Sequence, residues 1–122
     1  MPTRRALLKE LNNLRWKHGN PFPLHLHEEA SAHAQKHAEH LAKTGQFRHT
    51  EHHLMDSGHG FNSEILARVD PGLRPEDRAK AAVHLWERSN KSHRQLILNA
   101  EWHAAIGEKN GNVVVRLKQK KH

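Results

Sequence analysis

Histidine is the residue type in this sequence with the most chemistry to offer, because the 122 residues include 14 histidines and no cysteine. A neutral imidazole binds zinc at about 2.0–2.1 Å, and two imidazoles leave coordination positions for a carboxylate or water. His33, His37 and His40 recur at the spacing of one helix face. An exposed row of this kind binds Zn²⁺, Ni²⁺ or Cu²⁺, although a solvated polar face is its commoner role.

Catalysis by a side-chain nucleophile has little support. No serine lies in a G-x-S-x-G elbow, and the segment after His27 lacks the second histidine of an H-E-x-x-H zinc-protease helix. Glycine-rich loops that cradle phosphates are absent as well. The functions that remain are metal binding and a site built from histidine and carboxylate side chains.

Three blocks of sequence indicate a family. They are Gln46–Thr50 (QFRHT), Asn62–Leu66 (NSEIL) and Trp86–Asn99 (WERSNKSHRQLILN). The last block reads as a helix end, a polar turn and an apolar run. Together the blocks resemble those of the CAP superfamily (cysteine-rich secretory proteins, antigen 5 and pathogenesis-related 1), most of all its small bacterial-type, SCP-like members. The resemblance covers roughly residues 7 to 117 and implies a three-layer α-β-α sandwich.

The same resemblance implies a site. In that family, the positions of His49, Glu64 and His93 face one another across a cleft. His49 and His93 are then candidate ligands of a divalent metal, zinc above all. Glu64 is a third ligand, a general base, or the acceptor for one histidine's second ring nitrogen. The alternative is that the three side chains only organise the core, and their spacing alone forms no motif.

This chain departs from the family pattern in two places. The family's Gly-Glu-Asn block is Ser63–Ile65 (SEI) here, and Ser89 occupies the place of a second acid found three residues after the tryptophan in many eukaryotic members. Glu87, directly after Trp86, is expected to point elsewhere. A complete set of two histidines and two acids is therefore not expected. Bacterial-type members commonly lack that acid too, so the fold prediction stands.

Hydrophobic spacing predicts the elements that position these residues. Residues 4–18 form a helix with a leucine face, ended by Gly19, and residues 28–43 form a second helix with an alanine stripe, ended by Gly45. A loop over residues 50–62 follows, in which His52, His53 and His59 offer a further ligand or simply a polar surface.

The C-terminal half predicts a change from helix to strand. Pro75 suits the first turn of a third long helix. Residues 65–67, 102–107 and 113–117 are strand-like or apolar, and Asn110-Gly111 is a type I′ hairpin signal. Helices followed by an antiparallel meander predict an α+β fold, a small antiparallel sheet flanked by helices.

Length and charge bound the remaining possibilities. A chain of 122 residues predicts a single domain over 1–122, with a basic tail from about residue 118. The local basic cluster that ends in this tail begins at Arg116. Lys and Arg number 20 against 13 Asp and Glu, a net charge of +7, which favours anionic partners such as lipid headgroups or cell-wall polymers. The bland alternative is that this charge only keeps the domain soluble. Nucleic acid is not favoured, since no basic-aromatic platform is present.

Compartment is left open by the sequence. No run approaches the roughly 20 apolar residues of a membrane span, and without cysteine the fold must rely on packing. CAP proteins are usually secreted, but residues 1–5 do not resemble a signal peptide. Either a leader has been removed or the protein is not exported by that route.

The sequence thus favours a non-catalytic CAP/SCP-like binding module. Its His/Glu-lined cleft is expected to take a divalent metal and a lipid-like or peptide ligand. The alternative is a zinc-dependent hydrolase, with His49 and His93 as zinc ligands and Glu64 as ligand or general base. A weaker alternative is a salt-dependent binder of anionic polymers or nucleic acid. The oligomeric state stays open.

Overall fold

Helices and strands make up most of the chain that the computed structural model describes, which is residues 2–50 and 59–120. The elements of these parts are α1 (Pro2–Lys17), β1 (His25–Leu26), α2 (Glu28–Thr44), β2 (Ser63–Arg68), α4 (Pro75–Arg88), α5 (His93–Asn99), β3 (Ala100–Lys109) and β4 (Asn112–Gln119). The strands form one four-stranded sheet in the order β1-β3-β4-β2.

The β3–β4 hairpin forms as its sequence predicts. Asn110 and Gly111 have φ angles of 49° and 82°, the left-handed conformations that a type I′ turn requires. β2 pairs antiparallel with β4, which places Glu64 opposite Arg116. β1 pairs parallel with β3, so the sheet is mixed. Two residues are too few to show a strand period, which is why the sequence did not indicate β1.

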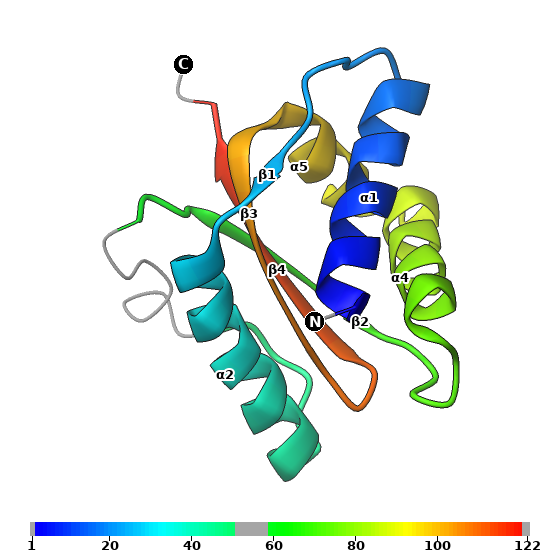
Figure 1. The fold of residues 1–122 in the computed structure, drawn as a ribbon, viewed down its shortest axis with the longest axis vertical. Helices are drawn as coiled ribbons and strands as arrows, with labels where there is room; N and C mark the ends of the chain where they lie inside the picture. Colours follow the sequence, from blue (N-terminus) through cyan, green and yellow to red (C-terminus); the bar gives the residue numbers. More distant parts are fainter. Residues whose placement is uncertain (1, 51–58, 121–122) are drawn as a thin grey trace.

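Helices cover both faces of the sheet (Figure 1). α2 lies on one face, and α1 and α4 lie side by side on the other. The alanine stripe of α2 packs with Leu41, Phe61 and Val114 in one core, while Trp86 and the leucines of α1 belong to the larger core on the opposite face. The predicted α+β fold, a three-layer α-β-α sandwich, is confirmed.

Local signals end the helices where the sequence indicates. Gly45, at φ 73°, ends α2 and donates its N–H to the Leu41 carbonyl at 2.9 Å. Pro75 is the first residue of α4. His27 caps the start of α2, because its Nδ1 accepts a hydrogen bond from the Ala30 N–H at 3.1 Å. No helix of the described residues is long and apolar enough to cross a bilayer.

α2 approaches the sheet closely because Gly107 of β3 has no side chain. A Cβ at Gly107 would overlap the backbone of Ala34 and Gln35. The Gln35 side chain accepts the Glu108 N–H at 2.9 Å and donates to the Glu108 carbonyl at 2.8 Å. These contacts fix the rotation of α2, and so decide which of its residues face outward.

Arg15 is a buried arginine on the leucine face of α1, four residues after Leu11. Its guanidinium donates to the carbonyls of Ile97 and Ala100, both at 2.7 Å, and to the Phe22 carbonyl at 2.7 and 3.0 Å. One side chain therefore joins α1 to the loop before β1, to the end of α5 and to the start of β3.

The C-terminal third differs from the sequence predictions in two places. Residues 93–99, for which the sequence indicated only an apolar run, form helix α5. β4 extends to Gln119, so the basic tail expected from about residue 118 begins inside the sheet. Arg116, which the sequence groups with that tail, is buried. It stands opposite Glu64 of β2 in the sheet.

Candidate functional site

Glu64 of β2 is a buried carboxylate, with 2% of its side chain exposed. Arg116 stands opposite it on β4 and donates from Nε to Glu64 Oε2 at 3.0 Å. Thr50 donates its backbone N–H to Oε1 at 2.8 Å and its hydroxyl to Oε2 at 2.6 Å. Both oxygens are thus bonded within the protein, and a guanidinium balances the charge.

Glu64 is held in its ionised form. Burial by itself would raise the pKa of Glu64, but the hydrogen bonds from Thr50 and the hydrogen bond and charge of Arg116 outweigh burial and lower that pKa. An ionised carboxylate only accepts hydrogen bonds. Any imidazole that bonds to it must therefore donate a proton.

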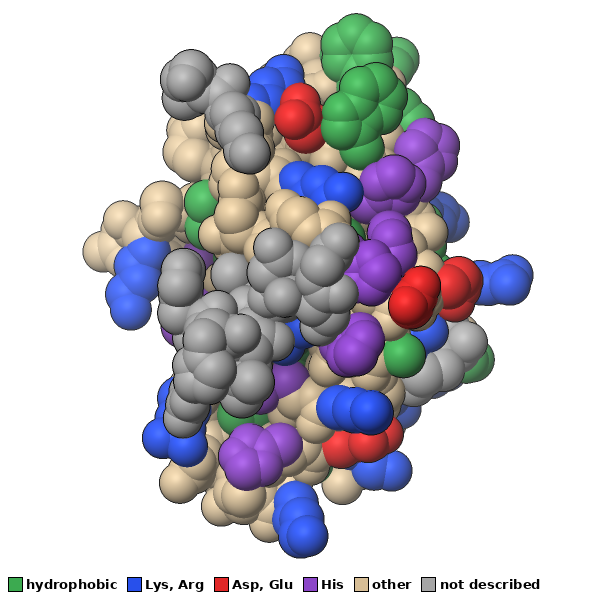
Figure 2. Space-filling view, turned by 90° about the vertical axis from the view of Figure 1, so that its left-hand side faces the viewer, with side chains coloured by type: hydrophobic (Ala, Val, Ile, Leu, Met, Phe, Trp, Pro, Cys, Tyr) green, Lys and Arg blue, Asp and Glu red, His purple; other side chains and the backbone are tan. Residues whose placement is uncertain are grey.

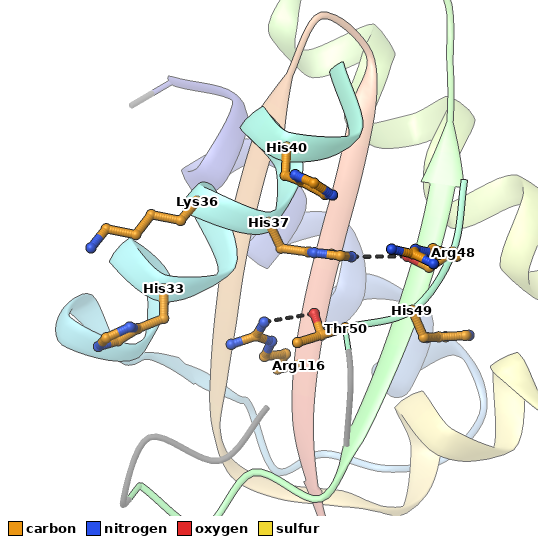
Figure 3. Close-up of a pocket in the computed structure, with 8 residues that line it drawn as sticks. All are labelled: His33, Lys36, His37, His40, Arg48, His49, Thr50 and Arg116. Atoms are coloured by element: carbon orange, nitrogen blue, oxygen red, sulfur yellow. Dashed lines mark hydrogen bonds between the residues drawn. The ribbon is translucent and has the colours of Figure 1, made fainter. Parts of the chain in front are cut away.

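His49 is the imidazole that Glu64 orients. Its Nδ1 lies 3.1 Å from Glu64 Oε1, so Nδ1 carries the proton of this hydrogen bond. The His49 side chain is 60% exposed. His49 lies on the segment that follows α2, across from the helix face that carries His37 and His40 (Figure 3). The structure thus brings together two of the three residues that the family resemblance grouped.

His93 is the first residue of α5, and its Nδ1 is buried without a hydrogen-bond partner among the described residues. Burial lowers the pKa of His93, and the charges of Lys91 and His49 lower it further. No hydrogen bond joins His93 to His49 in the described part of the chain.

The predicted zinc ligands fit a metal only in part. Within residues 2–50 and 59–120, no group of three or more histidine, aspartate or glutamate side chains is arranged to hold a metal ion. Because both Glu64 oxygens are already bonded, Glu64 fits an acceptor that orients a zinc-binding histidine better than it fits a direct ligand. His52 and His53, the further ligands considered from the sequence, lie outside the described residues. Zinc binding stays a prediction.

A pocket of about 460 Å³ opens beside His49. The residues that line it are His33, Lys36, His37, His40, Arg48, His49, Thr50 and Arg116. All of them except Thr50 carry an imidazole, ammonium or guanidinium group, and no carboxylate of the described residues lines the pocket. Figure 3 shows α2 on one side of this basic pocket and the segment with Arg48 and His49 on the other.

α2 contributes its basic residues because they share one helix face. Positions 33, 36, 37 and 40 follow the i, i+3, i+4, i+7 pattern of neighbours on a helix surface. His37 Nε2 lies 2.9 Å from the Arg48 carbonyl oxygen, which links the helix to the segment with His49. The histidine row seen in the sequence therefore belongs to the same site as His49. Lys36 and Arg48 were missed, although helix spacing was available as a signal for Lys36.

Further histidines continue from this pocket across the same face, where Figure 2 shows a band of them. The ring of His59 lies 4.5 Å from that of His27 and 6.4 Å from that of His33, and its Nε2 lies 3.7 Å from Glu29 Oε1. His59, considered from the sequence as an extra ligand beside His49, instead lies among the histidines near the start of α2.

A helix-covered mixed sheet, with a buried glutamate bonded to an exposed histidine, agrees with the CAP resemblance of the sequence. A family model described as CAP, the cysteine-rich secretory protein family, matches residues 8–104. The chain belongs to this family. No curated protein matches it.

A solved structure supports the same fold. It is an extracellular protein containing an SCP domain from Bacillus anthracis str. Ames, with 18% identity and a TM-score of 0.76. The match covers 97% of this chain and 40% of that one, so this chain spans well under half of that protein's length. At this identity the likeness shows the fold alone.

Proposed function

We propose that the protein is a non-catalytic CAP binding module whose basic pocket takes an anionic group of its ligand. The lining of the pocket carries the proposal, since imidazole, ammonium and guanidinium groups surround it. Glu64, the carboxylate behind it, is buried and balanced by Arg116. A concave surface of one sign of charge concentrates ligands of the opposite sign.

A phosphate or carboxylate group suits this lining. Lipid-like and peptide ligands, the classes expected from the family resemblance, carry such groups as a phosphate headgroup or a terminal carboxylate. An anionic cell-wall polymer carries many of them. The guanidinium of Arg48 offers a planar pair of donors and the ammonium of Lys36 a point charge. The net charge of +7 assists the approach of an anion.

The state of Glu64 supports binding over hydrolysis. A general base needs a free oxygen within reach of the water that it deprotonates. Glu64 accepts hydrogen bonds on both oxygens and has a lowered pKa. Its position is that of a residue that orients His49.

Inorganic phosphate is the simplest probe of the basic pocket. We expect phosphate to bind the protein in titration calorimetry, and Lys36→Ala or Arg48→Ala to weaken binding about tenfold, because each removes a charged hydrogen-bond donor.

Lys80→Ala is the matched control, since it also removes one lysine charge. Lys80 is an exposed residue of α4, which covers the opposite face of the sheet (Figure 1). The affinity of this variant for phosphate is expected to equal that of the unchanged protein. Equal losses in Lys36→Ala and Lys80→Ala would show that net charge, not the pocket, binds the anion, and would contradict the proposal.

Zinc is a second proposed occupant, because the Glu64–His49 hydrogen bond leaves His49 Nε2 oriented as a ligand. His49→Ala combined with His93→Ala is expected to abolish stoichiometric zinc uptake, measured by calorimetry on protein purified without a nickel column. Glu64→Gln is expected to weaken uptake about 10- to 100-fold. His84→Ala, which removes an exposed imidazole from α4, is the control. Unchanged uptake in the double variant would place the zinc elsewhere.

A further inference from the structure

A second groove, of about 430 Å³, lies where the loop between α1 and β1 meets the start of β3. Phe22 and Trp102 line it, and these large side chains are 73% and 68% exposed. Figure 1 places both segments at the same end of the molecule, and Figure 2 shows hydrophobic side chains gathered at that end. Neither ring is buried in the hydrophobic core, so core packing does not explain why large apolar side chains stand at these positions.

Trp102 is held outward by a strained backbone. Its φ angle is 68°, in the left-handed region that bulky residues rarely adopt. The register of β3 against β4 shifts between Ala100 and Ala104, so Trp102 lies in a bulge of the strand. Strain of this kind persists where the surrounding structure imposes it, and it concentrates at binding sites.

Arg15 holds both walls of the groove in place. Its guanidinium donates to the carbonyl of Phe22 on one wall and to the carbonyl of Ala100, two residues before Trp102, on the other. Pro21 and Pro23 flank Phe22 and restrict its backbone further. The two rings are thus positioned before any ligand arrives, which lowers the entropy lost on binding.

The charges of this groove differ from those of the basic pocket. Glu101 and Lys120 line it with opposite signs, and His25 adds an imidazole. The Arg15 guanidinium is engaged by backbone carbonyls. The groove therefore offers both a hydrogen-bond acceptor and a hydrogen-bond donor to a neutral ligand.

We propose that this groove binds a neutral sugar ring. A sugar presents C–H groups on one face and hydroxyls around its edge. The C–H face packs on the rings of Trp102 and Phe22, whose faces carry the negative end of the ring quadrupole. The hydroxyls donate to the Glu101 carboxylate and accept from Lys120, bonds strengthened by charge. The site is separate from the basic pocket and does not depend on it.

The test uses cellotetraose and chitotetraose, two neutral oligosaccharides, with calorimetry and tryptophan fluorescence as readouts. At least one is expected to bind the unchanged protein. Trp102→Gly and Phe22→Ala are each expected to weaken binding about tenfold or more. Glycine accepts a positive φ, so Trp102→Gly should retain or raise the thermal midpoint while losing the ligand. Trp16→Ala is the control. Trp16 is 69% exposed on α1 and does not line the groove, so this variant should bind the oligosaccharide as the unchanged protein does.

Two results would overturn the proposal. One is that neither oligosaccharide binds at millimolar concentration. The other is that Trp102→Gly binds them as well as the unchanged protein does. In the first case, sedimentation of the unchanged protein, but not of Trp102→Gly, with phosphatidylcholine vesicles would assign the two rings to a lipid surface.

Discussion

Replacing Glu64 with alanine is expected to lower the free energy of unfolding by about 3–5 kcal/mol, because it removes one member of a buried ion pair. Arg116 loses the carboxylate that it meets at 3.0 Å, and the N–H and hydroxyl of Thr50 lose their acceptor. The pair is among the most buried charged groups of the described residues. Urea denaturation followed by circular dichroism measures the change.

Glu87→Ala is the matched control. Glu87 also bonds a cation, Lys17 at 3.0 Å, but that pair lies at the surface, where such pairs contribute about 0–1 kcal/mol. A loss for Glu64→Ala no larger than that for Glu87→Ala would contradict the role given to the buried pair. Glu64→Gln keeps the shape of the side chain and so isolates the effect of charge.

The pH dependence of stability gives an independent check on the same residue. The pKa of Glu64 is lower in the folded protein than the ordinary value, so the folded state binds fewer protons than the unfolded chain. The stabilisation of the folded state by ionised Glu64 is complete above the ordinary carboxyl pKa of about 4.3. This stabilisation is lost as the pH falls through the lower pKa that Glu64 has in the folded protein. Stability should therefore fall more steeply in acid for the unchanged protein than for Glu64→Gln.

The elements with regular spacing were predictable, and the elements without it were not. Leucine and alanine periodicity predicted α1 and α2, and Asn110-Gly111 predicted the hairpin, because each signal is local. β1 owes its pairing to β3, and α5 is a seven-residue helix with no side-chain cap. Tertiary contacts decide such short elements, and one sequence does not display them.

The candidate site was predictable to a lesser extent. The family blocks placed His49 with Glu64, which the structure brings to 3.1 Å. They did not indicate that Arg116 would neutralise Glu64, because Arg116 reads in sequence as part of a basic tail. The basic pocket was missed for a related reason. The helix face with Lys36 meets the segment with Arg48 only through the packing of α2 on the sheet.

The two faces of α2 thus depend on each other. Gly107 and the Gln35–Glu108 hydrogen bonds set the rotation of the helix on the sheet. That rotation leaves His37 near the carbonyl of Arg48. The basic pocket on the outer face of α2 therefore requires the close approach of its inner face to β3 at Gly107. The residues of the pocket and those of this contact are different.

Arg15→Met is expected to lower the free energy of unfolding by about 3 kcal/mol or more. Methionine retains an unbranched apolar stem but offers no donors to the carbonyls of Ile97 and Ala100, and each buried acceptor left unbonded costs about 1–3 kcal/mol. Arg5→Met, an exposed position on the same helix, should change stability by less than about 0.5 kcal/mol. Arg15→Lys should lie between them, since one ammonium does not bridge several carbonyls as a guanidinium does. Equal stabilities for Arg15→Met and Arg5→Met in urea denaturation would show that these carbonyls find other donors, and that Arg15 does not join the segments it contacts.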